Sequence, residues 1–160
     1  MQSYAPIENK DEVAVRKICE RLSKGLDILE VGTGNSTHIF KEYGTITSVD
    51  ADLERLEFFK PDIAVHTDSM NFKPSKKYDI IFVDGCHTYH TVKTELDNLY
   101  PFVKDGGYLC GHDFDGYGYD DSYIGQDTVS GKHHGVVKAV TEKFGTVELV
   151  DNTCVWCVKK

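Results

Sequence analysis

Short apolar runs alternate along the chain with segments whose apolar residues recur at helical spacing. Residues 11–23 form the first helical segment, and Gly25 ends it. The same pattern predicts strands at residues 27–31, 45–49 and 63–66, the last of them weak, and short helices at residues 36–43 and 52–59. Strands that alternate with helices predict an α/β domain with a largely parallel sheet.

The second half of the chain continues the alternation and then changes character. Residues 78–83 are the most apolar run and predict a central buried strand. A helix at residues 89–100, a strand at 108–111, a helix at 135–144 and a closing hairpin of residues 147–150 and 153–158 complete the expected elements. Residues 113–134 are rich in Gly, Tyr and Asp and have no period, which is typical of a functional or mobile stretch.

Composition limits the classes of protein that fit. The 160 residues are 40% hydrophobic and 28% charged, which predicts one soluble domain over residues 1–160. A net charge of -8 argues against a broad nucleic-acid surface, and no apolar run is long enough for a membrane span. Five scattered cysteines are typical of reduced thiols, so a cytoplasmic location is expected.

The clearest chemistry follows the first predicted strand. Residues 30–34 read Glu-Val-Gly-Thr-Gly, and the second strand ends in Asp50. A glycine turn lets the backbone approach a ligand, and an acid after the second strand can accept hydrogen bonds from both ribose hydroxyls. These residues therefore predict a nucleoside cofactor.

Two positions indicate which cofactor this is. A dinucleotide fingerprint needs a third glycine for close helix packing, and Thr37 stands at that position. Glu30 stands where dinucleotide folds usually carry an apolar residue. An acid suits a cation, such as the ammonium of S-adenosylmethionine, better than it suits a pyrophosphate. The turn therefore favours the methyl donor.

Further motifs, in the same order, resemble the class I S-adenosylmethionine-dependent methyltransferases. Residues 30–34 and Asp50 are similar to the first two motifs of that family, and Thr67-Asp68-Ser69 follows the third strand. Asp84-Gly-Cys-His87-Thr-Tyr after the fourth strand and Gly-His112-Asp113 after the fifth resemble one branch, the small-molecule O-methyltransferases of the methyltransferase-24 type. That branch is similar in turn to the macrolide-sugar O-methyltransferases. The resemblance extends over residues 11–158.

The resemblance implies a fold and a set of cofactor contacts. The fold is Rossmann-like, with a seven-stranded, mostly parallel sheet and a C-terminal antiparallel hairpin. Glu30 would hold the methionine ammonium directly or through water, Asp50 would bind the ribose and Asp68 would face the adenine amino group. The other positions expected at the cofactor are Gly32, Thr33, Gly34, Ala51, Ser69 and Asp84.

Candidate catalytic residues follow the fourth and fifth strands. Asp84 and His87 come after the central strand, where ligands bind in open α/β sheets. A histidine there can take a proton from a hydroxyl near neutral pH. His87 is therefore the expected base, with Asp84 and Asp113 orienting the substrate. The structural alternative is that His87 caps the following helix.

Asp84, His112 and Asp113 are also candidate ligands of a divalent metal ion. In the resembling sugar methyltransferases, acids at these strand ends bind magnesium and orient two substrate hydroxyls. This chain has His112 in place of an acid, and imidazole is a poorer magnesium ligand than carboxylate, so a transition ion is the alternative. His133 and His134 are interpreted as a surface pair, with substrate contact as the alternative.

The predicted function is transfer of a methyl group from S-adenosylmethionine to a hydroxyl of a small molecule such as a sugar or phenol. Only residues 1–10 precede the first helix, so the usual substrate-recognition elements are reduced. The acceptor site would then be open, completed by a second subunit in a homodimer, or absent. The last case corresponds to an alternative function, a non-catalytic S-adenosylmethionine- or nucleoside-binding or regulatory domain with the same fold.

Overall fold

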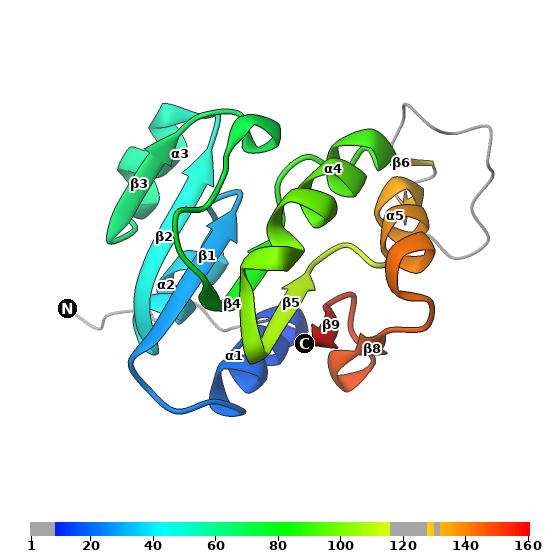
Figure 1. Cartoon of the computed structure of the whole chain (residues 1–160), viewed down its shortest axis with the longest axis horizontal. Coiled ribbons are helices and arrows are strands. Elements are labelled where there is room, and N and C mark those ends of the chain that lie inside the picture. Colours follow the sequence, from blue (N-terminus) through cyan, green and yellow to red (C-terminus); the bar gives the residue numbers. More distant parts are fainter. Residues whose placement is uncertain (1–8, 116–127, 130–131) are drawn as a thin grey trace.

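A seven-stranded sheet forms the centre of the computed structural model, which describes residues 9–115, 128–129 and 132–160 (Figure 1). Its strands are β1 (Leu26–Val31), β2 (Gly44–Asp50), β3 (Ile63–His66), β4 (Tyr78–Val83), β5 (Val103–Gly111), β8 (Glu148–Leu149) and β9 (Trp156–Lys159). Their order in space is β3-β2-β1-β4-β5-β9-β8. The pairs from β3 to β5 are parallel, and β9 pairs antiparallel with both β5 and β8. The predicted fold class is confirmed.

Five helices cover the two faces of this sheet in the described part of the chain. They are α1 (Lys10–Glu20), α2 (Asn35–Lys41), α3 (Leu53–Phe59), α4 (Tyr89–Leu99) and α5 (His134–Phe144), with short 3-10 turns η1 (Ser69–Asn71), η2 (Tyr100–Phe102) and η3 (Val150–Asn152). A reciprocal capping box between Asn9 and Glu12 starts α1. None of these helices combines the length and apolar character that a membrane crossing requires.

Successive residues of each strand point to opposite faces, so the sheet has two cores. Leu29, Ile81 and the other strand residues that point to the same face pack against α4 and α5. Ile28, Ile80 and the other strand residues of the opposite face pack against α1 and α2. The inner strands β1 and β4 are buried on both sides, as is usual in a parallel sheet, whereas the edge strand β3 is largely exposed.

Three predicted segments differ from the structure. Strand β5 begins at Val103 rather than at residue 108. The expected turn at Gly106-Gly107 lies inside this strand, where its register against β4 shifts between Tyr78 and Ile80. The closing hairpin is shorter than expected at β8, and η3 connects it to β9. Within the stretch expected to be irregular, the short strands β6 (Thr128–Val129) and β7 (Lys132–His133) pair with each other. The rest of that stretch, residues 116–127 and 130–131, lies outside the described residues.

The functional edge of the sheet lies where the chain order reverses, between β1 and β4. The chain proceeds outward from β1 to β2 and β3 on one side, and from β4 to β5 on the other. The connections that follow β1 and β4 therefore run in opposite directions, which opens a crevice at the carboxyl ends of the strands, although the two loops touch where they leave the sheet. Gly32 lets the two loops pack, because a Cβ there would lie 2.2 Å from the carbonyl oxygen of Asp84 and its φ is +84°.

Candidate active site

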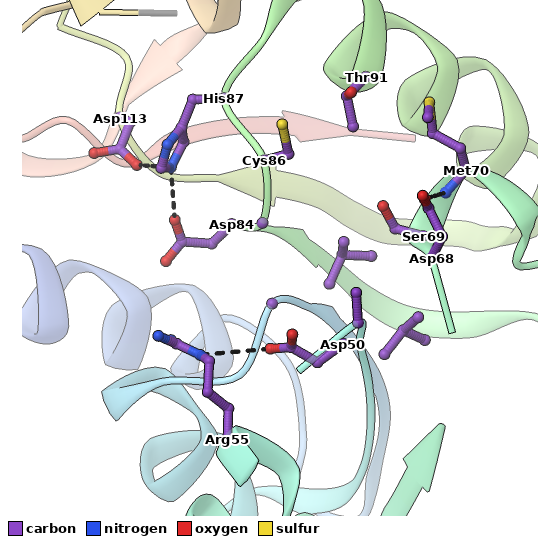
Figure 2. Close-up of a pocket in the computed structure, with 15 residues that line it drawn as sticks. Asp50, Arg55, Asp68, Ser69, Met70, Asp84, Cys86, His87, Thr91 and Asp113 are labelled. Atoms are coloured by element: carbon purple, nitrogen blue, oxygen red, sulfur yellow. Dashed lines mark hydrogen bonds and ion pairs between the residues drawn. The ribbon is translucent and has the colours of Figure 1, made fainter. Parts of the chain in front are cut away.

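A cavity of about 500 Å³ lies at this edge of the sheet (Figure 2). Residues at or just after the carboxyl ends of five neighbouring strands line it, together with side chains from α3 and α4. The lining comprises Val31, Gly32, Val49, Asp50, Ala51, Arg55, Asp68, Ser69, Met70, Asp84, Gly85, Cys86, His87, Thr91 and Asp113. Eight of the twelve site residues predicted from the sequence line this cavity, and Thr33, Gly34 and His112 lie in the loops beside it. The topology therefore brings together groups from Val31 to Asp113.

Asp50 ends β2 and faces one end of the cavity. The backbone N–H and the hydroxyl of Thr33 donate to its Oδ2 at 2.8 and 2.7 Å, and the N–H of Asp52 donates to its Oδ1 at 2.9 Å. Burial opposes ionisation, but these hydrogen bonds and the charge of Arg55 hold the pKa of Asp50 below its ordinary value. Asp50 is thus a fixed anion that ties the glycine turn to β2.

Arg55 of α3 is a site residue that the sequence did not reveal. Its Nε lies 3.6 Å from Oδ2 of Asp50, and its guanidinium donates to the carbonyl oxygen of Thr33. Figure 2 shows the side chain extending toward Asp50 along the cavity wall. The only available signal was a basic residue one helical turn after the predicted start of this helix, which many surface helices share.

Glu30 lies behind the wall rather than at it. Its carboxylate is fully buried and accepts hydrogen bonds from the hydroxyls of Ser36, Thr37 and Ser48, the last two at 2.7 Å. Burial raises the pKa of Glu30 to about 7, against the effect of the three hydroxyl donors. A direct contact with an ammonium would need a carboxylate oxygen at the cavity wall. Both oxygens of Glu30 instead accept hydrogen bonds from hydroxyls behind that wall.

Asp68 and Ser69 follow β3 on the same side of the cavity as Asp50. Asp68 caps η1 by accepting from the N–H of Met70 at 2.9 Å, and both Asp68 and Ser69 line the cavity. Ser69 donates its hydroxyl to the buried Glu95 of α4. Ala51 borders the cavity after Asp50, and its carbonyl oxygen contacts the ring of His66 at 3.0 Å. These residues form a polar wall suited to a nucleoside.

The opposite end of the cavity carries an acid–imidazole cluster. Nε2 of His87 lies 2.6 Å from Oδ2 of Asp113 and 3.7 Å from Oδ1 of Asp84, and Figure 2 shows the ring between the two acids. Asp113 holds a left-handed backbone conformation, with φ at +61°, which is uncommon for a residue other than glycine. Hydrogen bonds to Asp113 and Asp84 raise the pKa of His87 to about 10. His87 is therefore an imidazolium at neutral pH.

Two more histidines join this cluster. Nδ1 of His112 lies 3.2 Å from Oδ1 of Asp113, and its Nε2 lies 2.8 Å from Asp11 of α1. His133 of β7 lies 3.0 Å from Asp115 and 3.5 Å from Asp113, and its ring centroid is 4.6 Å from that of His87. His133 is thus only partly exposed and belongs to the site, whereas the sequence favoured a surface position. The β6–β7 pairing that brings it there has no clear sequence pattern.

Burial and hydrogen bonds affect the charges of this cluster in opposite directions. Burial would lower the pKa of His112, but Asp113 and Asp11 raise it to about 9. Burial also raises the pKa of Asp84, whereas hydrogen bonds from His112 and His87 hold the pKa of Asp113 well below its ordinary value. The acids and imidazoles therefore neutralise one another within the cluster.

The donor atoms of the cluster are close enough for a metal ion. Asp84, His112 and Asp113 offer one ligand atom each within 4.8 Å of one another, and so do His87, Asp113 and His133. Each set mixes imidazole nitrogen with carboxylate oxygen. Such sets suit divalent transition ions, whereas magnesium prefers oxygen ligands alone. The residues fit a transition ion better than magnesium.

A second cavity of about 260 Å³ adjoins the first and shares Arg55 and Asp84 with it. Its other walls include the first turn of α1, with Asp11 and Glu12, and His112 after β5. The two cavities meet at Asp84, beside the acid–imidazole cluster. Two adjoining spaces therefore lie on either side of Asp84.

A family model described as a methyltransferase domain, Methyltransf_24, matches residues 29–114. The match covers more than half of the chain and extends from β1 to just beyond Asp113, so it includes the strand ends that line the cavity. No curated protein sequence matches the chain.

Several solved structures with a similar fold are methyltransferases. The N-methyltransferase NodS from Bradyrhizobium japonicum WM9, in complex with S-adenosyl-L-homocysteine, has a TM-score of 0.60 at 19% identity over 88% of this chain and 76% of that chain. MycE from the mycinamycin pathway, in complex with Mg, S-adenosylhomocysteine and mycinamycin VI, has a TM-score of 0.61 at 21% identity over 91% and 47%. Coclaurine N-methyltransferase has a TM-score of 0.53 at 18% identity over 71% and 40%. The present chain therefore spans less than half the length of the last two proteins.

Proposed function

Because the chain belongs to the methyltransferase-24 family of methyltransferase domains, we propose that it transfers the methyl group of S-adenosylmethionine to a hydroxyl of a small molecule such as a sugar or a phenol. The observation that carries this proposal is one continuous cavity with two chemically different ends. Asp50 and Asp68 line one end, and Asp84, His87 and Asp113 line the other. The first set suits a nucleoside, and the second suits a polar group that must lose a proton.

The nucleoside end would hold the methyl donor in an extended form. Asp50 would accept the ribose hydroxyls, with Ala51 beside the adenine and Asp68 facing its amino group. Gly32 and Gly34 would let the turn approach the methionine part, and Thr33 would keep the turn against Asp50. NodS, MycE and coclaurine N-methyltransferase, which are similar in fold and were solved with S-adenosylhomocysteine, support this choice of cofactor.

Glu30 would serve the cofactor indirectly. Its three hydroxyl partners lie on α2 and β2, so the carboxyl connects both elements beneath the glycine turn. We therefore assign Glu30 the role of positioning the turn, in place of the direct contact with the methionine ammonium that the motif suggested as one of two possibilities.

The reaction places simple demands on the protein. The acceptor oxygen attacks the methyl carbon as the carbon–sulfur bond breaks, S-adenosylhomocysteine leaves, and the hydroxyl proton passes to a base. The methyl group is already activated, so holding the oxygen in line supplies much of the acceleration. Asp84 and Asp113 would orient the acceptor hydroxyl, and His87 would take its proton.

The resting charge of His87 adds a condition to this scheme. An imidazolium paired with two carboxylates has no free nitrogen lone pair to receive a proton. His87 would become a base only when an acceptor hydroxyl or a cation takes over its carboxylate partners and lets it lose a proton. A divalent ion held by Asp84, His112 and Asp113 would also lower the pKa of a bound hydroxyl. The proposal thus links base function to occupation of the acceptor site.

An acceptor panel tests the function. Purified protein would be incubated with S-adenosylmethionine and with sugars, catechols, phenols or amines, with and without Mg²⁺, Mn²⁺ or Zn²⁺, and S-adenosylhomocysteine release would be measured. Turnover with hydroxyl compounds is the expected result. Turnover with amines alone would replace O-methylation by N-methylation. Binding of S-adenosylhomocysteine without turnover on any acceptor would favour the non-catalytic alternative.

A further inference from the structure

A buried acid lies directly behind the wall at the nucleoside end of the cavity. Glu95 of α4 has no exposed surface, and its Oε1 accepts the hydroxyl hydrogen of Ser69. A Cβ at Gly85, which also lines the cavity, would lie 3.8 Å from the same oxygen. The second oxygen, Oε2, has no hydrogen-bond partner among the described residues. A carboxyl so placed is costly to bury, so its position calls for a role beyond packing.

The hydrogen bond between Ser69 and Glu95 determines whether the Ser69 hydroxyl donates or accepts at the cavity wall. A serine hydroxyl has one hydrogen and two acceptor lone pairs. Ser69 directs its hydrogen away from the cavity, toward Glu95, so only its lone pairs remain for a ligand. The Oε1 atom accepts whether the carboxyl is ionised or carries its proton on Oε2. Ser69 therefore presents an acceptor, and a ligand group beside it must be a donor.

We propose that Glu95 is a specificity-determining residue: by accepting the Ser69 hydroxyl hydrogen, it makes the cavity wall select an amino-purine over an oxo-purine. The inference rests on the proposed methyl donor, whose adenine carries an exocyclic amino group. An oxo group in place of that amino group would bring one hydrogen-bond acceptor, the oxo oxygen, against another, the hydroxyl oxygen of Ser69. Asp68, which lies on the same wall and is also an acceptor, favours the same base.

A purely structural role for Glu95 predicts something different. The helix α4 holds η1 through two side-chain hydrogen bonds, one from Ser69 to Glu95 and one from Asn98 Nδ2 to the carbonyl oxygen of Met70 at 3.4 Å. If Glu95 only fixed η1, its loss would weaken the binding of every nucleoside equally. Asn98→Ala removes the second bond without touching Ser69, so it is the matched control.

The test compares two ligands that differ only in the base. Calorimetry would measure the Kd of S-adenosylhomocysteine and of S-inosylhomocysteine, its deaminated analogue, for the wild type and for Glu95→Leu, Glu95→Gln, Ser69→Ala and Asn98→Ala. We expect the wild type to prefer the adenosyl compound by roughly a hundredfold. Glu95→Leu removes the acceptor and frees the Ser69 hydrogen, while Glu95→Gln can donate to Ser69. Glu95→Leu should narrow the preference for the adenosyl compound by about tenfold, as should Ser69→Ala, and Glu95→Gln should narrow it less, because the amide oxygen can still accept from Ser69.

The outcomes separate this inference from the proposed function. An unchanged preference in both Glu95 variants, or an equal loss of affinity for both ligands, would overturn the role of Glu95. If Asn98→Ala narrowed the preference for the adenosyl compound as much as the Glu95 variants do, the effect would come from the position of η1 instead. In the Ser69→Ala background, Glu95→Leu should narrow the preference no further, because the two residues act through one hydroxyl. A wild type that binds neither ligand would refute the methyl donor itself, and the base preference with it.

Discussion

Replacing Glu30 by Gln should change how the stability of the protein depends on pH. Burial raises the pKa of this carboxyl from its ordinary 4.5 to about 7. The folded protein therefore retains a proton that the unfolded chain has already released, and unfolding releases it between about pH 4.5 and about pH 7. The free energy of unfolding falls as the pH rises through this window. Above it, the ionised Glu30 costs about 3 kcal/mol relative to a neutral side chain.

Gln has nearly the same shape as Glu and cannot ionise. Its amide can accept from two of the surrounding hydroxyls and donate to another, so the network beneath the glycine turn can persist. The stability of Glu30→Gln relative to the wild type should therefore increase by about 2.5 kcal/mol between about pH 5 and about pH 8. Urea unfolding at several pH values, followed by circular dichroism, measures this difference.

The control is Glu57→Gln, the same chemical change on the exposed side of α3. If wild type and Glu30→Gln give parallel curves of stability against pH, the ionisation of Glu30 is not coupled to folding and the reasoning fails. The same variant also tests the positioning role. Its Kd for S-adenosylhomocysteine should stay within about threefold of the wild type, whereas loss of a direct charge contact to the ammonium would raise it by about tenfold or more.

Three other substitutions test the site. Gly32→Ala should destabilise the protein by about 2 kcal/mol more than Gly106→Ala in urea unfolding, because both glycines have a positive φ but only a Cβ at Gly32 would collide with the backbone of Asp84; equal losses would contradict this account. Asp50→Asn should raise the Kd for S-adenosylhomocysteine by about tenfold or more in calorimetry. His87→Ala should lower turnover by about a hundredfold or more while that Kd stays within about threefold; full activity would remove the base role.

The strands and the acids that gather at their carboxyl ends were predictable because local patterns determine them. An apolar run that ends in an acid or glycine defines both a strand and its carboxyl end, and parallel pairing then brings those ends to one edge. Asp50, Asp68 and Asp84 meet for that reason alone. The start of β5 was less predictable, since Gly106-Gly107 reads as a turn, although the strand continues through it between the Tyr78–Val103 and Ile80–Tyr108 pairs.

Other parts of the site depend on contacts with no local signal. Asp11 meets His112 across 101 positions of sequence, and the β6–β7 pairing brings His133 to Asp113. Glu95 reads as one polar residue on an amphipathic helix, and only the packing of η1 on α4 reveals that it is buried. In each case tertiary packing decides the environment of the side chain. The residue type and its spacing in the sequence therefore could not reveal it.

Two imidazoles, those of His87 and His112, explain how the fold keeps the neighbouring acids Asp84 and Asp113 at the strand ends. Partly buried carboxylates close to one another repel, and a site built from acids alone needs a cation to hold them together. Here His87 and His112 supply that positive charge, because contacts with Asp113 and other acids raise the pKa of His87 to about 10 and of His112 to about 9. A metal ion would have to displace those protons from its ligands, so its binding would compete with an arrangement that is already neutral. Because His112 stands where an acid would add negative charge, the acids and imidazoles of the cluster can hold their positions without a bound ion or acceptor.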